Sequence, residues 1–216
     1  HLAEAGYDIG LHWFTSQLEA ENTRSEIEGL GRKVYLFQAD LRQPQEIVGM
    51  FEQVSEAGVY ITLLVNSASV MPRSDLMEIN WQEWDDTTNL NLRAVWLMSQ
   101  QAARVMNPGG LILNISDAGA TQQWTGYGAY VISKNGVNAL TKLLAKQLAP
   151  SLRVNGIAPG LLLKPPAMTD EEWQKLAIRV PMRSAGDMDG FMSTIDLLIS
   201  NEYITGEIIT LNGGDT

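Results

Sequence analysis

Short apolar runs alternate along the chain with longer segments in which apolar residues recur at helical spacing. Short runs of this kind are typical of buried strands, and the longer periodic segments are typical of amphipathic helices. The expected strands are Tyr7–Trp13, Lys33–Phe37, Ile61–Val65, Leu111–Ile115, Leu152–Ile157 and Glu207–Leu211. The expected helices are Gln17–Leu30, Pro44–Ala57, Trp81–Met106, Tyr127–Ala149, Thr169–Ile178 and Asp187–Ser200. In addition, His1–Gly6 is expected to form the last turns of a helix that stops at Gly6.

Strands that alternate with helices of this length imply βαβ units and a mainly parallel sheet. Right-handed crossovers then favour a doubly wound, Rossmann-like α/β fold. The 216 residues suit a single domain with a large core.

Polar residues stand at the carboxyl ends of the expected strands, where ligands bind in sheets of this class. Strand-to-helix turns also favour polar residues as helix caps, so a capping role and a binding role are both open for them. These positions are Thr15 and Ser16, Asp40, Asn66, Ser116 and Asp117, and Pro159 and Gly160.

Composition narrows the classes of function. The net charge of −10 argues against non-specific nucleic-acid binding and against docking on anionic membranes. The chain has no cysteine and only two histidines, so no zinc or redox-metal site is expected. No apolar run approaches the roughly 18 residues of a membrane span, and no signal peptide is visible, so a cytoplasmic location is expected.

Tyr130 and Lys134 are the candidate chemical pair. Residues four apart on a helix lie one above the other on the same face. A nearby ammonium favours the phenolate, so Lys134 is expected to lower the pKa of Tyr130 and make it a usable general acid or base. The same spacing also fits an ordinary half-buried tyrosine beside a solvated lysine.

Five motifs in order along the whole chain resemble the short-chain dehydrogenase/reductase family. They are Asn66-Ser67-Ala68, Asn91 within Leu90–Ala94, Tyr130 with Lys134, the segment Val154–Gly160, and Gly213-Gly214. The resemblance implies a Rossmann fold that binds a nicotinamide cofactor. The family's first strand and glycine-rich pyrophosphate loop are not found in the sequence, which indicates an N-terminally incomplete domain.

Asp117 stands thirteen residues before Tyr130, where the family carries a serine. An aspartate at this position, together with His12 and Ser16, resembles the pteridine reductase branch. The resemblance implies hydride transfer from NADPH to a pterin, with Tyr130 as proton donor. A carboxylate also accepts hydrogen bonds from pterin N–H groups better than a serine does.

The resemblance assigns further roles. Lys134 is expected to bind the nicotinamide ribose, and Asn91 to hold a water that links Lys134 to solvent. Met71 and Trp124 are expected to line the substrate pocket with Asp117 and Tyr130, and Met168 is a further candidate wall. The expected cofactor-binding residues are His12, Thr15, Ser16, Asp40, Leu41, Asn66, Ser67, Ala68, Ser116, Tyr130, Lys134, Pro159 and Gly160.

Cofactor choice follows from the segment Trp13–Ser16. An acidic residue there would bond the ribose 2′-hydroxyl and select NAD. The segment has no acid, which favours NADP, although Thr15 replaces the arginine common in the pteridine branch. The alternatives are a reductase of another carbonyl substrate, such as a 3-oxoacyl thioester or a ketone, and a catalytically impaired cofactor-binding or scaffolding homologue. The family resemblance also implies a homotetramer built on the two longest helices.

Overall fold

The computed structural model describes residues 1–215 and divides into two compact units, His1–Tyr60 and Ile61–Thr216. Each unit has its own parallel sheet, one of two strands and one of four. All six strands fall within the segments expected from the apolar runs or extend them by a few residues, and every strand pair is parallel. The expected α/β class with a parallel, Rossmann-like sheet is confirmed. The expectation of a single domain stays a prediction.

In the first unit, β1 (Ile9–Trp13) pairs with β2 (Val34–Gln38). Helix α1 (Gln17–Gly29) joins the two strands and packs on both. Helix α2 (Pro44–Glu56) follows β2 and begins with Pro44, whose fixed φ suits the first turn of a helix. Because the strands are parallel, the residues after Trp13 and after Gln38 lie at the same edge of this sheet.

In the second unit, the strand order is β3 (Ile61–Asn66), β4 (Met106–Ile115), β5 (Arg153–Pro159) and β6 (Ile208–Leu211). The two central strands supply the apolar core, with Ile112, Leu113, Val154 and Ile157 fully buried. Burial on both faces explains why these strands read as continuous apolar runs instead of alternating patterns.

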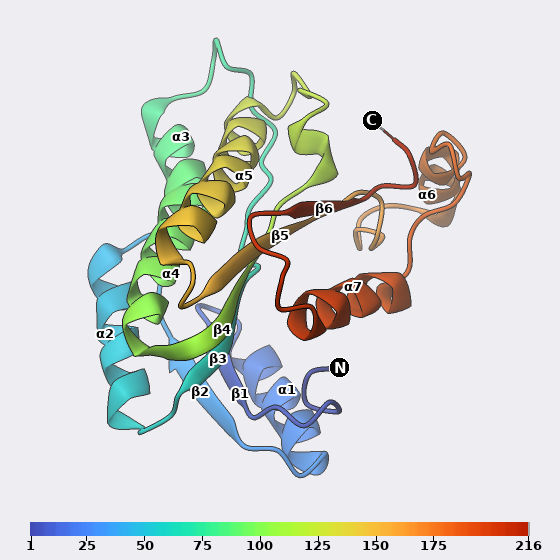
Figure 1. The fold of residues 1–216 in the computed structure, drawn as a ribbon. Helices are drawn as coiled ribbons and strands as arrows, with labels where there is room; N and C mark the ends of the chain where they lie inside the picture. The colour runs from blue at the N-terminus through green and yellow to red at the C-terminus, as the bar shows by residue number, and fades with distance from the viewer. Residues whose placement is uncertain (216) are drawn as a thin grey trace. The chain divides into compact units, whose positions relative to one another are not determined.

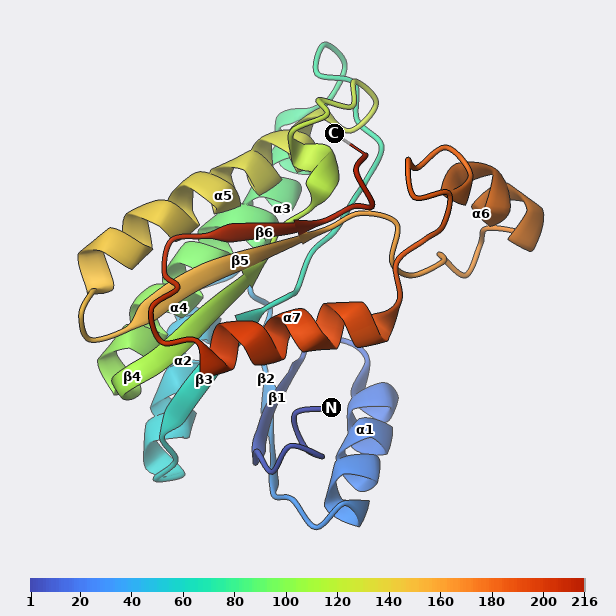
Figure 2. The ribbon, with the colours of Figure 1, turned by 45° about the vertical axis from the view of Figure 1, so that its right-hand side comes forward.

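Helices cover both faces of the four-stranded sheet. Figure 1 shows α4 (Ala94–Val105) and α5 (Gly128–Leu148) on one face, and Figure 2 shows α7 (Met188–Ser200) on the other. Helix α6 (Asp170–Ala177) stands on the long connection between β5 and α7 and begins with a capping box made by Thr169 and Glu172.

The single helix expected over Trp81–Met106 is wrong in detail. Helix α3 (Trp81–Thr88) passes into one π-helical segment, η1 (Asn89–Arg93), before α4 begins. Met106 is the first residue of β4, and the strand continues through Pro108-Gly109-Gly110, which were expected to end a helix. His1–Gly6 forms hydrogen-bonded turns, although Gly6 does take the expected positive φ of 97°.

A buried polar network ties the strand ends of this sheet to its helices. Asn66 donates to Asn114 Oδ1 at 2.9 Å and to Ser99 on α4 at 3.3 Å. Asn114 in turn donates to Thr141 on α5 at 2.9 Å. Since a buried amide left without partners is costly, this network fixes the register of β3, β4 and the two helices.

Candidate functional site

The centre of the site is a hydrogen bond between Tyr130 and Asp117. The Tyr130 hydroxyl donates to Asp117 Oδ2 at 2.6 Å, and the backbone N–H of Gly119 donates to Asp117 Oδ1 at 2.6 Å. Asp117 follows β4 and caps the short 3-10 helix η2 (Ala118–Ala120), whereas Tyr130 lies in the first turn of α5. The predicted pair of site residues thirteen positions apart is therefore brought into direct contact. The capping role that was also open for Asp117 is present as well.

Lys134 lies one turn after Tyr130 on the same helix, as the spacing predicted. Its Nζ donates to the backbone oxygen of Ile115 at 2.9 Å and lies 5.8 Å from the centre of the Tyr130 ring. Burial lowers the pKa of Lys134 to about 8, and the carboxylate of Asp117 opposes this shift. The lysine is therefore poised close to neutral pH instead of being the solvated side chain of the alternative interpretation.

The expected direction of the Tyr130 pKa shift is wrong. Burial, the charge of Asp117 and the hydrogen bond to Asp117 together raise the pKa of Tyr130 above its ordinary value. Lys134 is not the charge nearest to the phenol, because the Asp117 carboxylate accepts its hydrogen bond and disfavours the phenolate. Tyr130 is accordingly held as a protonated hydrogen-bond donor.

Asn91 lies in the π-helical segment η1 and is almost completely buried. Its side chain exchanges two hydrogen bonds with the backbone of Val70 and also donates to Ser133 on α5. Ser133 then donates to the backbone oxygen of Tyr130 at 2.7 Å. The side-chain amide thus fastens the segment after β3 to α5, while the predicted water beside Lys134 stays a prediction.

The two expected pocket walls have different surroundings. Trp124 closes over Gly119, where any Cβ atom would collide with the indole, and its Nε1 donates to Gln122 at 2.8 Å. It also meets the Tyr127 ring edge-on at 6.1 Å between centroids. Met71 is exposed on the segment after β3. Trp124 is therefore adjacent to the loop of Asp117, and the substrate role of Met71 stays a prediction.

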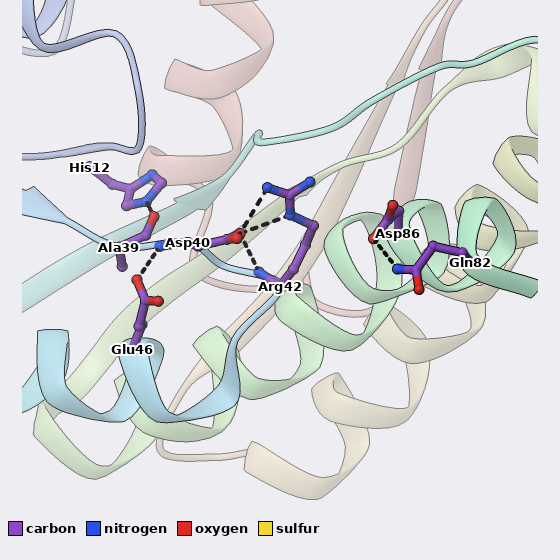
Figure 3. A network of polar contacts seen from close by, with 7 residues as sticks. All are labelled: His12, Ala39, Asp40, Arg42, Glu46, Gln82 and Asp86. Atoms are coloured by element: carbon purple, nitrogen blue, oxygen red, sulfur yellow. Dashed lines mark hydrogen bonds and ion pairs between the residues drawn. The ribbon is translucent and has the colours of Figure 1, made fainter.

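The predicted cofactor residues of the first unit gather at the carboxyl edge of β1 and β2. His12 Nε2 lies 2.8 Å from the Ala39 oxygen, and Asp40 is held by two side-chain bonds from Arg42, as drawn in Figure 3. These bonds, more than any other cause, lower the pKa of Asp40. Thr15 and Ser16 are exposed, and Leu41 is buried.

In the second unit, the predicted cofactor residues follow β3, β4 and β5. Ser67 and Ala68 are exposed, whereas the side chain of Asn66 belongs to the buried network described above. Ser116 is buried and donates to the Lys134 backbone oxygen at 3.3 Å. Pro159 and Gly160 are partly exposed at the end of β5, and the close approach of Asn212 leaves little room for a side chain at Gly160.

Sequence reasoning missed three residues that hold this arrangement. Ser133 links Asn91 to Tyr130. Gln122 accepts a hydrogen bond from the Trp124 indole, and Arg42 forms a bidentate pair with Asp40. Arg42 alone gave a signal, since an arginine two residues after an expected binding aspartate is a natural ion-pair partner. The contacts of Ser133 and Gln122 depend on loop and helix geometry that periodicity does not encode.

An open groove of about 470 Å³ lies beside α6 and includes Met168, Leu176 and Arg179 in its lining. Its lining includes none of Asp117, Tyr130 and Lys134, so it is not part of the candidate site around Tyr130. Over residues 1–215, no group of three or more histidine, aspartate or glutamate side chains is placed to hold a metal ion. Within the same residues, no helix is long and apolar enough to cross a membrane.

Known proteins resemble this chain over nearly its whole length. The family model described as Enoyl-(Acyl carrier protein) reductase matches residues 1–216. The 3-oxoacyl-[acyl-carrier-protein] reductase FabG of Staphylococcus aureus is 32% identical over an alignment of 220 residues, which covers 99% of this chain and 89% of the relative. The 2-dehydro-3-deoxy-D-gluconate 5-dehydrogenase of Escherichia coli is 33% identical over an alignment of 225 residues, which covers 99% of this chain and 87% of the relative.

Two solved structures are similar in fold and were determined with NADP. FolM alternative dihydrofolate reductase 1 from Brucella canis has a TM-score of 0.92 and 28% identity, covering 99% of this chain and 85% of that protein. A short chain dehydrogenase from Burkholderia cenocepacia has a TM-score of 0.90 and 29% identity, covering 99% and 89%. The chain belongs to the short-chain dehydrogenase/reductase family, a family of oxidoreductases, as its motifs indicated.

Proposed function

We propose that this protein reduces a pterin, such as a dihydropterin or a biopterin-like compound, with NADPH as the hydride donor. The observation that carries the proposal is the 2.6 Å hydrogen bond from Tyr130 to Asp117. A ketone oxygen needs hydrogen-bond donors, which a serine hydroxyl supplies and a carboxylate cannot. A pterin instead presents ring N–H and amino donors, for which a carboxylate is the stronger acceptor.

The residues of the site fit the proton side of this reaction. Bound NADPH supplies the hydride, which goes to the carbon of a C=N bond. Tyr130, held protonated by burial and by Asp117, gives its proton to the nitrogen, and solvent then restores that proton. Asp117 orients the substrate by accepting hydrogen bonds from N–H groups of the pterin. Once Tyr130 has given up its proton, the positive charge of Lys134 stabilises the phenolate.

Two observations support NADPH as the cofactor. Trp13–Ser16 at the end of β1 carries no carboxylate to select NAD. Similar structures from Brucella canis and Burkholderia cenocepacia were determined with NADP.

One of these structures also supports the pterin substrate. The alternative dihydrofolate reductase acts, by its name, on a compound that contains a pterin ring. The cytoplasm stays the predicted location.

The second candidate is reduction of a 3-oxoacyl thioester, because the FabG relative is 32% identical over nearly the whole chain. The two candidates differ at Asp117. Turnover with NADPH should be compared for dihydrobiopterin and an acetoacetyl thioester, in the wild type and in Asp117→Ser. Asp85→Ser, an exposed aspartate of α3, is the matched control.

We expect the wild type to prefer the pterin and Asp117→Ser to raise the KM for the pterin about tenfold, the order of one lost charge-assisted hydrogen bond. Turnover of the thioester should fall less or rise. A wild type that prefers the thioester, or a variant with equal effects on both substrates, would contradict the pterin proposal. A protein that binds no NADPH would instead favour the scaffolding alternative.

A further inference from the structure

The ribose 2′-phosphate of NADP requires a cation that the segment after β1 does not contain. Phe14, Thr15 and Ser16 are uncharged, and the protein as a whole carries a net charge of −10. A dianionic phosphate is bound well only where a local positive charge offsets such a field. A cation from another part of the same sheet edge would meet this requirement.

Arg42, which follows β2, brings a positive charge to this edge. Its guanidinium carbon lies 5.4 Å from the centre of the Phe14 ring, directly beyond the end of β1. The two strands are parallel and in register, with Trp13 opposite Gln38, so residues that follow them are neighbours. Arg42 thus brings a cation beside Phe14, the residue before Thr15.

Asp40 fixes the orientation of this guanidinium. Arg42 Nε donates to Asp40 Oδ1 at 2.9 Å and its second terminal nitrogen donates to Oδ2 at 3.1 Å, as Figure 3 shows. The backbone N–H of Arg42 also donates to Asp40 Oδ1. Asp40 is itself anchored, because its N–H donates to Glu46 in the first turn of α2 at 2.6 Å. A bidentate pair with this support is rigid.

The exposure of the two side chains indicates whether Arg42 or Asp40 is accessible to a ligand. The Asp40 side chain is 15% exposed and the Arg42 side chain is 35% exposed, so the carboxylate lies deeper and the cation lies nearer to solvent. The hydroxyls of Thr15 and Ser16 are exposed beside Phe14, and the Ser16 side chain makes no capping bond to α1. Planar guanidinium groups with nearby hydroxyls are well suited to phosphate.

We propose that Arg42, braced by Asp40 and stacked on Phe14, is the residue that recognises the 2′-phosphate and selects NADP over NAD. It takes over the task for which the pteridine branch uses an arginine at position 15. Asp40, expected from the sequence to bind the cofactor, is then a positioning residue for Arg42. The proposal rests on the proposed cofactor but not on the pterin substrate.

The first test measures binding of NADPH and NADH, without any substrate, by equilibrium titration of the reduced cofactor's fluorescence. Arg42→Gln should weaken NADPH binding about tenfold or more, the loss of one or two charge-assisted hydrogen bonds, and leave NADH within about twofold. Arg32→Gln is the matched control, because Arg32 is 33% exposed and is paired with Asp8 at 2.8 Å in the same unit. It should leave both affinities unchanged.

Equal weakening of both cofactors by Arg42→Gln, or no weakening of either, would overturn the role of Arg42. A wild type that prefers NADH would overturn the proposed cofactor instead, so the two failures are distinguishable.

A second test needs no variant and therefore does not depend on the stability of Arg42→Gln. Arginines of the wild-type protein are modified with phenylglyoxal and located by mass spectrometry, with adenosine 2′,5′-bisphosphate or AMP present. We expect Arg42 to be protected by the bisphosphate and much less by AMP, while Arg32 reacts equally in both. Equal reactivity of Arg42 under the two conditions would overturn the proposal.

Discussion

At the scale of single residues, Asp117 determines the protonation state of Tyr130. A phenol that donates to a carboxylate in a buried site keeps its proton, because ionisation would place two negative charges side by side. The protonated form that the reductive direction needs is therefore present, whereas the phenolate that would remove a proton from an alcohol is disfavoured. The serine of other family members would not impose this bias, since a hydroxyl carries no charge.

Tyr130→Phe tests whether this proton is the one used in turnover. The change keeps the ring and removes only the hydroxyl, so NADPH affinity should stay within about twofold while kcat falls at least about a hundredfold, the low end for a lost general acid. Tyr203→Phe, at a fully exposed tyrosine, is the control and should have no effect. Retained turnover in Tyr130→Phe would mean that Asp117 or water supplies the proton.

Lys134 gives the protein a distinctive dependence of stability on pH. The unfolded chain keeps the lysine proton up to the ordinary pKa of 10.5, whereas the folded chain releases it near 8. The unfolded state therefore binds more protons between these values, so the contribution of Lys134 to the free energy of unfolding increases with pH across this window. The total gain is about 3 kcal/mol, from about 1.4 kcal/mol for each unit of pKa.

Lys134→Met removes this contribution and is therefore the reference with which the wild type is compared. Urea denaturation at pH 7.5 and pH 10 should show the wild type gaining stability relative to Lys134→Met as the pH rises. All other titrating groups are common to both proteins, so they cancel in the comparison. If the difference in the free energy of unfolding between the two proteins stays constant over this range, the pKa of Lys134 is not lowered in the folded state.

At the scale of elements, the loop between η2 and α5 is fastened by Gln122. Its Oε1 accepts from the Trp124 indole at 2.8 Å, and its Nε2 donates to the backbone oxygen of Asp215 at 2.8 Å. The same oxygen also accepts from Asn212, at the end of β6. The Trp124 indole, the predicted pocket wall, is thereby linked to the C-terminal segment, which lies far away in sequence.

Gln122→Leu should loosen this wall without changing the proton donor. We expect the KM for the substrate to rise several-fold, in line with two hydrogen bonds of about 1 kcal/mol each, while kcat stays within about twofold. Acrylamide quenching of Trp124, obtained by difference from Trp124→Phe, should increase. Gln122→Glu keeps the acceptor for the indole and should show a smaller effect. A fall in kcat with an unchanged KM would contradict a wall role.

The elements also show what sequence patterns can and cannot predict. Apolar runs located every strand, because burial on both faces leaves a continuous signal, and the parallel sheet then placed Asp117 and Asn66 at strand ends. The π-helical segment around Asn91 was invisible, since one extra residue per turn hardly disturbs a helical period. Two contacts depend on loop geometry and side-chain direction, which spacing alone does not specify. They are the hydrogen bond from Tyr130 to Asp117 and the bidentate pair of Arg42 with Asp40.

At the scale of the whole molecule, the remaining expectation is a homotetramer that uses the segments Trp81–Met106 and Tyr127–Ala149, which contain α4 and α5. Helices α4 and α5 contact each other within the second unit, and both expose large apolar side chains: Trp96 on α4, and Ile132 and Leu143 on α5. An apolar helical face of this kind is costly in water and is typical of an interface between copies.

Leu143→Asp should therefore weaken assembly, because a charge buried between two copies without a partner is strongly unfavourable. Sedimentation velocity should show a tetramer for the wild type and smaller species for Leu143→Asp at the same concentration. Leu18→Asp on α1 is the matched control, since Leu18 is 71% exposed and Leu143 is 65% exposed. The control should sediment as the wild type does. A wild type that sediments as a monomer, or equal effects of the two variants, would remove the α4 and α5 face as the site of assembly.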